Sequence, residues 1–305
     1  MDNNNNHTVV CFGEVLWDIL PTGAVPGGAP MNVAYHLHKQ KIDPALITKI
    51  GIDDEGKKLI NIFSRQGICT DFFQVDYKNQ TGKVYARPAN DNEMVYDILM
   101  PVAWDFIQLE DELNNLVATA DYFLFGSLAA RNKVSKATLF RLLEIAKNKV
   151  LDINLRAPHF NKQGVIELLS KADFLKINMT ELELITGWFS NHKSIVDRMK
   201  SVRDKFKIAN MVVTVGADGA VLYMNETITI HKGFKVDVVD TVGSGDAFLA
   251  GLLGKLIKNT GPEEALEFAC GLGAFIATQQ GACPQYELQM VTDLIDTKKE
   301  YFNLK

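Results

Sequence analysis

The sequence predicts an α/β fold in which helices cover both faces of a mostly parallel sheet, and a second, smaller β-sheet projects from this domain. Three observations lead to this prediction. From about residue 110 onward, short apolar segments alternate with amphipathic segments of helical period. The region 72–100 instead contains strands joined by short polar loops. A chain of 305 residues is long enough for one large α/β domain with an appendage.

The alternating region supplies the main sheet and its helices. Short, fully apolar strands are typical of a parallel sheet that is buried on both faces. The predicted strands are Tyr122–Phe125, Val150–Asn154, Phe174–Ile177 and Met211–Val215. The predicted helices are Glu112–Ala120, Ser135–Lys147, Val165–Lys171, Glu181–Ile185 and Ile195–Phe206.

The small sheet is predicted from the region before residue 100. Phe72–Val75, Gly82–Ala86 and Met94–Leu99 have strand character, and a polar loop at Asn90–Glu93 favours an antiparallel meander. Together with Glu14–Leu20, these strands form the expected small sheet. A small sheet with an apolar face needs cover from a bound ligand or from a second subunit. Both a lid over a ligand and a dimer interface are therefore expected.

Composition excludes several classes of protein. A hydrophobic content of 47% and a charged content of 23% are ordinary for a soluble globular protein, and a net charge of -5 argues against nucleic-acid binding. No apolar run reaches the length of a membrane span, and the N-terminal residues lack signal-peptide character. The 4 cysteines are widely spaced and suggest neither a zinc site nor disulfides. We therefore expect free thiols and a cytoplasmic protein, with Cys11 and Cys270 in the core.

The stretch Asp240–Asp246 is the strongest candidate for chemistry. A strand is expected before it, at Phe234–Val239, and a buried helix after it, at Ala247–Ile257. Glycines on both sides of Ser244 leave backbone N–H groups unobstructed at the helix N-terminus, where phosphate is attracted. A carboxylate at Asp246 would repel phosphate, but it suits a site that must take a proton from an attacking hydroxyl. The alternative is a plain helix start, with Ser244 as N-cap and Asp246 complementing the helix dipole.

A second candidate segment lies near the N-terminus. A strand ends close to Asp18, and the pair Gly27 and Gly28 precedes a helix in which Asn32 lies one turn from the start. Paired glycines let a ligand approach the backbone closely, and an ionised carboxylate accepts two O–H donors, as a polyol offers. A plain turn followed by a helix explains the same residues without a ligand.

These two segments resemble the two signatures of the PfkB, or ribokinase-like, carbohydrate kinases. Residues 240–248 fill every position of the pattern D-T-x-G-x-G-D-A-F, and residues 27–34 fill G-G-A-P-x-N-V-A. The resemblance runs from Phe12 to about Pro284 and is nearest to bacterial fructokinase. It implies one three-layer α/β/α kinase domain over residues 1–305, with a β lid formed by about 14–28 and 72–100.

The resemblance also implies roles for residues of both segments. Gly243, Ser244 and Gly245 correspond to the anion hole for the transferred phosphoryl group, and Asp246 to the catalytic base. The positions that correspond to sugar contacts are Asp18, Gly27, Gly28 and Asn32.

Further positions follow from the same resemblance, which implies ATP, Mg²⁺ and K⁺ as cofactors. Asn178 and Glu181 fit an N-x-x-E motif that organises Mg²⁺ and phosphates, with Glu181 acting through water; a capped helix start is the alternative. Asp240 is a candidate for holding K⁺. The positions implied on the nucleotide side are Thr214, Gly216, Gly219, Ala274 and Gly281.

Two arginines and one tryptophan complete the candidate residues. Arg156 ends the segment Asp152–Arg156, which matches a D-x-N-x-R pattern of the family, and either it or Arg87 is expected to reach the substrate. A structural salt bridge is the alternative role of Arg156. Trp104 is expected to pack beneath the lid.

The implied activity is transfer of the γ-phosphate of ATP to a primary hydroxyl of a free sugar, with fructose first. A 2-keto-3-deoxygluconate kinase would use Arg87 or Arg156 as a cation, and a nucleoside kinase would use Tyr85 or Phe106 for stacking; ribokinase is a further alternative. A catalytically silent sugar sensor is the rival from another class, and such a protein is expected to have lost Asp246 or a loop glycine. The expected partners are sugar, ATP and a second copy of the chain bound through the lid, with no nucleic acid or membrane.

Overall fold

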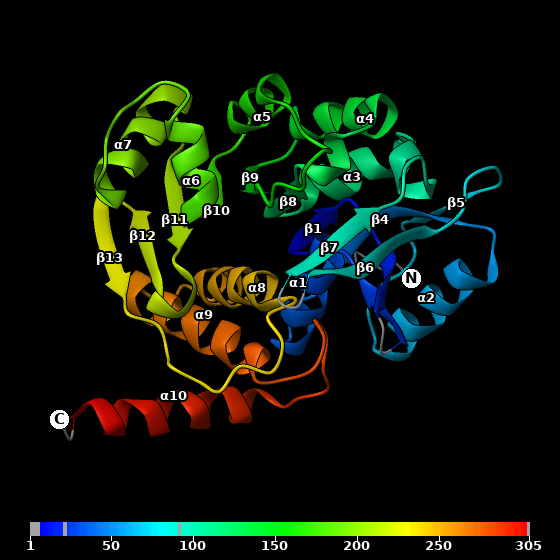
Figure 1. Ribbon diagram of the computed structural model, residues 1–305. Coiled ribbons are helices and arrows are strands. Elements are labelled where there is room, and N and C mark those ends of the chain that lie inside the picture. Colours follow the sequence, from blue (N-terminus) through cyan, green and yellow to red (C-terminus); the bar gives the residue numbers. More distant parts are fainter. Residues whose placement is uncertain (1–6, 21–22, 91–92, 304–305) are drawn as a thin grey trace. The chain divides into compact units, whose positions relative to one another are not determined.

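The computed structural model describes residues 7–20, 23–90 and 93–303, with side chains throughout except at 86–90, 93–96 and 300–303. The chain divides into two compact units (Figure 1). Unit 1 comprises Met1–His38 and Asp43–Asn148, and unit 2 comprises Lys39–Ile42 and Lys149–Lys305. Each unit contains its own set of buried apolar side chains.

Unit 1 contains parallel strands in the order β8, β1, β4, β5. Their bounds are β1 Val9–Phe12, β4 Pro44–Gly51, β5 Phe73–Asp76 and β8 Tyr122–Gly126. All side chains of β1 are fully buried, as expected for a continuous apolar strand in the middle of a parallel sheet. The helices of this unit are α1 Ala29–Lys39, α2 Asp54–Arg65, α3 Asp111–Thr119 and α4 Lys133–Leu143, with short 3₁₀ turns η1 Ala103–Phe106 and η2 Leu128–Ala130.

A separate small sheet in unit 1 has the strand order β3, β2, β6, β7. The strands are β2 Leu16–Leu20, β3 Gly23–Gly27, β6 Gly82–Asn90 and β7 Glu93–Ile98. β2 runs antiparallel to β3 but parallel to β6, and β6 and β7 form an antiparallel hairpin.

The small sheet differs from the prediction in one strand. The segment predicted at Phe72–Val75 does form β5, but it pairs in parallel with β4, with Thr48 opposite Phe73. The physical reason is helix α2, which the sequence analysis did not predict. A strand that follows such a crossover helix returns parallel to the strand before it. The ring of Phe73 packs against Phe63 of α2, with ring centroids 6.0 Å apart, and this contact fixes β5 in place.

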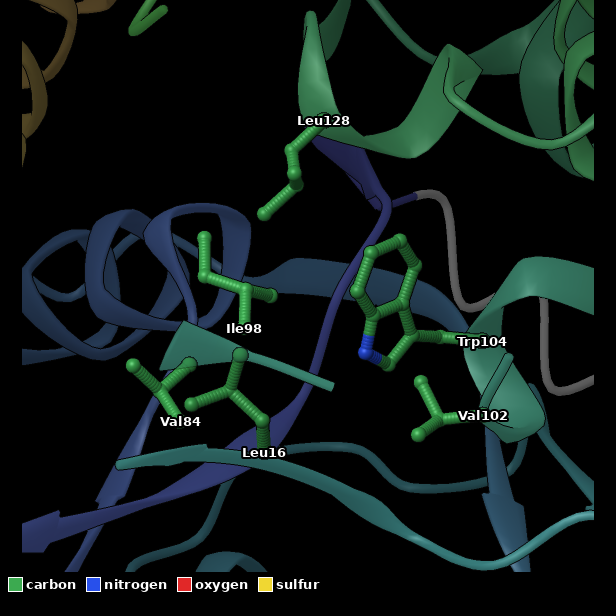
Figure 2. Close-up of a cluster of buried hydrophobic side chains, with 6 residues drawn as sticks. All are labelled: Leu16, Val84, Ile98, Val102, Trp104 and Leu128. Atoms are coloured by element: carbon green, nitrogen blue, oxygen red, sulfur yellow. The ribbon is translucent and has the colours of Figure 1, made fainter. Parts of the chain in front are cut away.

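One face of the small sheet is covered by the chain itself. Leu16, Val84 and Ile98, one from each of three strands, pack against Val102, Trp104 and Leu128 (Figure 2). Trp104 is fully buried, so the expectation that it packs beneath this sheet is confirmed. A Cβ atom on Gly82 would lie 2.5 Å from Trp104 Nε1, so only glycine fits at the start of β6. Over this part of the face, no bound ligand or second subunit is needed as cover.

Unit 2 contains strands in the order β9, β10, β11, β12, β13, of which the first three are parallel and the last two antiparallel. Their bounds are β9 Asn148–Asp152, β10 Phe174–Asn178, β11 Asn210–Thr214, β12 Ala220–Met224 and β13 Thr227–His231. Helices α6 and α7 pack on β10 and β11, and α9 packs on β12 and β13 (Figure 1). The helices are α5 Lys162–Leu169, α6 Met179–Thr186, α7 Ile195–Phe206, α8 Ser244–Ile257, α9 Pro262–Ala277 and α10 Leu288–Asn303, with a 3₁₀ turn η3 Gly216–Asp218.

The predicted alternation of helices and strands after residue 110 is confirmed, and α7 has the predicted bounds. The strand predicted at Phe234–Val239 is wrong. Only Phe234 in this segment is buried, and Val238 and Val239 are 59% and 66% exposed. The N–H groups of Val239 and Asp240 donate to the carbonyl of Ala277 at the end of α9. The backbone is thus held by a helix C-terminus instead of a neighbouring strand. In the described part of the chain, no helix has the length and apolar character that crossing a membrane requires.

Candidate active site

Asp18 in unit 1 lies on β2, opposite Val25 of β3 and Val84 of β6. Its carboxylate folds over the end of β3, because a Cβ atom on Gly27 would lie 2.1 Å from Asp18 Oδ2. Gly28 has φ +121°, and a Cβ atom there would lie 2.3 Å from the carbonyl oxygen of Glu14. Gly28 therefore requires glycine, whereas a side chain at Gly27 would have to displace the Asp18 carboxylate.

Asn32 joins the same group of residues. Its backbone N–H donates to the Gly28 carbonyl at 2.9 Å, and its side chain is buried. Asp18 and Gly27 therefore lie together in unit 1, and Asn32 follows Gly28 by one helical turn. Arg87 lies on β6, but its side chain lies outside the described residues.

The apolar cluster beneath the small sheet borders Asp18. Side chains two residues apart on a strand point to the same face, so Asp18 shares its face with Leu16. Its register partner Val84 also belongs to that cluster. A carboxylate beside buried apolar side chains suits a small ligand with an apolar face and several hydroxyls.

In unit 2, the loop before α8 begins with a left-handed residue. Gly243 is the N-cap of α8 with φ 77°, and a Cβ atom there would lie 2.5 Å from the Cβ of Ala282. The alternative in which Ser244 caps the helix is wrong, because the positive φ and the close contact both require glycine at the cap. Ser244 is the first helical residue, and its hydroxyl is buried without a hydrogen-bond partner among the described residues.

The first turn of α8 provides the groups expected of a phosphate site with a base. Amides in a first helical turn have no intrahelical acceptor, and here they belong to Ser244, Gly245 and Asp246. The Ser244 amide reaches the carbonyl of Thr241 at 3.3 Å. Asp246 is 9% exposed, and its negative charge raises the pKa of both Lys176 and Cys283. For both groups burial is the largest influence; it raises the pKa of the Cys283 thiol and lowers that of Lys176.

Lys176 and Asp152 form a buried ion pair that the sequence analysis missed. They are direct neighbours across β10 and β9, and Lys176 Nζ lies 3.0 and 2.9 Å from the two carboxylate oxygens. The nearest atom to a Cβ placed on Gly245 is Lys176 Nζ, at 3.2 Å. The signal for this pair was a lysine within the strand Phe174–Ile177, since a parallel strand buried on both faces rarely contains a charge.

Asn178 and Glu181 form the capping box of α6. Asn178 Oδ1 accepts the Glu181 N–H, and Glu181 Oε2 accepts the Asn178 N–H, each at 2.9 Å. Glu181 Oε1 accepts the N–H of Leu155 at 2.7 Å. Burial is the main cause that raises the pKa of Glu181, and nearby Asp152 raises it further. The helix-start role of this motif is therefore present in the structure.

Asp240 connects two loops of unit 2. Its Oδ1 accepts the Val242 N–H at 3.0 Å, and its Oδ2 accepts the Gly281 N–H at 3.1 Å. Gly281 has φ +76° and open space where a Cβ would lie. Among the described residues, no three His, Cys, Asp or Glu side chains are grouped to hold a metal.

The remaining predicted residues of unit 2 lie near the ends of its strands. Thr214 ends β11, opposite Asn178. Gly216 and Gly219 have φ 58° and 89° in the turn to β12, and a Cβ on Gly219 would lie 1.9 Å from the carbonyl oxygen of His231. Ala274 is half-buried on α9, and Arg156 is exposed after β9. The carboxyl ends of β9, β10 and β11 thus bring Asp152, Asn178 and Thr214 to one edge, where α/β sheets usually bind ligands.

Comparison with known proteins identifies the family of this chain. The family described as "pfkB family carbohydrate kinase" matches this chain over residues 9–288. The chain is 30% identical to "Probable fructokinase-7" of Arabidopsis thaliana, over 98% of this chain and 96% of that protein. It is also 30% identical to "Fructokinase-1" of Oryza sativa subsp. japonica, over 90% of this chain and 93% of that protein.

Solved structures show the same fold. Fructokinase from Xylella fastidiosa with bound ATP superposes with a TM-score of 0.85 at 22% identity, covering 96% of this chain and 99% of that one. Fructokinase from Vibrio cholerae O395, in a form with fructose, ADP and calcium ion bound, superposes with a TM-score of 0.81 at 24% identity. The match covers 95% of this chain and 100% of that one. The fold is thus the ribokinase-like α/β fold, with a large mostly parallel sheet and a small separate sheet. The family match over most of the chain and the two filled signatures together show that this chain belongs to the pfkB family of carbohydrate kinases.

Proposed function

We propose that this protein transfers the γ-phosphate of ATP to a primary hydroxyl of free fructose. The observation that carries the proposal is Asp246, a buried carboxylate in the first turn of α8, directly after the glycine loop Gly243–Gly245 at the N-terminus of this helix. The names of the relatives support fructose as the acceptor. The Vibrio cholerae protein, solved with fructose and ADP, supports both substrates.

Each group of residues has one role in the proposed reaction. Asp18, Gly28 and Asn32 bind sugar hydroxyls, and Asp246 accepts the proton of the attacking hydroxyl. The hydroxyl oxygen forms a bond to the γ-phosphorus while the bond to the β,γ-bridging oxygen breaks, and ADP leaves. The amides of Gly243, Ser244 and Gly245 bind the oxygens of the transferred phosphoryl group and stabilise the negative charge on them during the transfer.

Mg²⁺ fits this site as a water-mediated partner of Glu181. Both carboxylate oxygens of Glu181 already accept backbone N–H groups, which leaves lone pairs for ordered water. Mg²⁺ usually keeps several waters and neutralises phosphate charge when bound. Asn178 and Glu181 are the residues that would hold it, beside Thr214 on the nucleotide side.

K⁺ is proposed beside Asp240. The Asp240 carboxylate fixes both loops through Val242 and Gly281, so carbonyl oxygens of these loops are held in place for a monovalent cation. Gly216, Gly219 and Ala274 are proposed to line the nucleotide. Arg156 or Arg87 is proposed to contact the substrate.

The proposal is tested by measuring ADP release with fructose, ribose, 2-keto-3-deoxygluconate and adenosine. We expect fructose to give the highest kcat/KM. A higher kcat/KM with another acceptor would assign that acceptor as the substrate in place of fructose. Binding of a sugar without any ADP release would indicate a sensor.

Asp246→Asn should lower kcat by roughly 10²–10⁴-fold, the usual contribution of a general base, while sugar and ATP still bind. Asp237→Asn is the matched control, because Asp237 is exposed in the same unit. Near-normal kcat in Asp246→Asn, measured by ADP release with binding followed by calorimetry, would refute the assignment of Asp246.

We also infer a homodimer formed through the small sheet and a cytoplasmic location. Ile19 and Tyr85 lie opposite each other on β2 and β6 and are both partly exposed, which leaves apolar surface for a second copy. All 4 cysteines are free thiols, which supports a reducing compartment. The net charge of -5 gives no basis for binding nucleic acid.

A further inference from the structure

The ion pair between Lys176 and Asp152 contains none of the residues to which the proposed reaction assigns a role. Lys176 is 8% exposed, and both Asp152 oxygens lie within 3.0 Å of its Nζ. Buried ion pairs add little stability over apolar residues, because both charges lose their hydration. Stability alone is therefore a weak reason for a buried lysine in the middle of β10 and a buried aspartate at the end of β9.

The position of the ammonium points toward the glycine loop. Nζ lies 3.2 Å from where a Cβ of Gly245 would be, so it lies against the first turn of α8. A cation at a helix N-terminus is unfavourable for the helix dipole, and the stability of α8 therefore does not explain it. A cation suits this place if the turn must hold negative charge.

Three carboxylates act on the ammonium of Lys176. Burial lowers the pKa of Lys176, but Asp152, Asp246 and Glu181 outweigh burial and raise it above its ordinary value. Lys176 is therefore a cation at neutral pH. One ammonium serves three carboxylates, of which Asp152 holds it directly and Asp246 belongs to the turn that it touches.

We propose that Lys176, oriented by Asp152, is a positioning residue that holds the Gly245–Asp246 turn and the Asp246 carboxylate in place for proton transfer. The inference rests on the proposed function, because it assigns a task to Asp246 as base. Lys176 then affects the chemical step indirectly, through the position of Asp246, and does not bind resting ATP.

The test uses three variants of the full chain. Lys176→Met removes the ammonium at similar length, and the double variant Lys176→Met with Asp152→Asn removes both charges, so that no buried charge remains unpaired. Lys149→Met is the control. Lys149 pairs with Asp173 at 3.4 Å near the N-terminal ends of β9 and β10. Its substitution therefore removes a more exposed lysine–aspartate pair from the same two strands, away from the loop.

Kinetics and thermal unfolding are measured for each variant. We expect kcat to fall by roughly 10–100-fold in both Lys176 variants, since displacement of a catalytic group by about 1 Å costs up to about 10²-fold. The KM values for sugar and ATP should stay within about threefold of wild type, and Lys149→Met should keep its kcat.

Several outcomes would overturn the inference. A folded double variant with wild-type kcat would do so, as would a raised KM for ATP with unchanged kcat, because Lys176 would then act as a nucleotide ligand. If neither variant folds while Lys149→Met does, the pair serves stability and the inference is wrong. These results differ from failure of the proposed function, which would appear as normal turnover in Asp246→Asn.

Discussion

At Gly27, the carboxylate of Asp18 occupies the space that a side chain would need, with Oδ2 2.1 Å from the position of a Cβ. Gly27→Ala should therefore displace Asp18 and raise the KM for fructose by roughly 10–100-fold, because a misplaced binding group loses its hydrogen bonds to the sugar. The KM for ATP should not change. Steady-state kinetics with each substrate varied in turn measures both values.

Gly164→Ala is the control for this substitution. The nearest atom to a Cβ at Gly164 is 3.5 Å away, in ordinary contact, and alanine is favourable in helix α5. An unchanged fructose KM in Gly27→Ala would show that Asp18 does not bind the sugar.

Residues of the two signatures could be predicted because each signature is a short stretch of sequence. Asn32 stands close to Gly27 and Gly28, and Asp246 stands close to Gly243 and Gly245. Lys176 and Asp152 could not be paired in this way. They are 24 residues apart, and only the register of β9 and β10 places them opposite each other. The capping residue of α8 could not be predicted from the sequence either. The choice between Gly243 and Ser244 depends on a positive φ and on contact with Ala282, which only the structure shows.

At the scale of elements, Asp53 connects helix α2 to the small sheet. It accepts the N–H of Gly56 at 2.8 Å as N-cap of α2, and the N–H of Thr81, just before β6, at 2.8 Å. Its carboxylate also accepts the Thr81 hydroxyl. Burial raises the pKa of Asp53, but these hydrogen bonds outweigh burial and hold it below its ordinary value.

Asp53→Ala should lower the free energy of unfolding by about 2–4 kcal/mol, through loss of a cap and of hydrogen bonds to a charged group. The contribution of Asp53 is fully present above the ordinary aspartate pKa of 3.8 and is lost as pH falls through the lower folded value. Urea unfolding at several pH values measures both effects. Asp54→Ala, at an 83% exposed side chain, should change little. Equal losses in the two variants would contradict the role of Asp53.

Local periodicity was enough to predict the helices and strands after residue 110. Strand pairing was harder, because it is decided by contacts far along the chain. β5 has the same polar and apolar pattern as a hairpin strand, and only the crossover through α2 assigns it to β4. Phe234–Val239 alternates like a strand but is not one, and at its end the N–H groups of Val239 and Asp240 donate to the carbonyl of Ala277.

For the whole molecule, the proposed dimer is measurable by sedimentation. We expect a species of twice 33.9 kDa. Ile19→Lys, which places a charge on the apolar surface of the small sheet, should shift it to the monomer. Val238→Lys, at an exposed position of unit 2, should leave the dimer intact. A wild-type chain that sediments at 33.9 kDa would remove the dimer proposal.

The packing around the small sheet also determines how the protein fluoresces. Two of the 3 tryptophans border this sheet. Trp104 is buried beneath it, with the Arg131 guanidinium carbon 3.8 Å from its ring centroid, and Trp17 on β2 donates its indole N–H to the carbonyl of Glu55. Their emission therefore reports on the element that carries Asp18, and the protein contains its own optical probe of the proposed sugar-binding region.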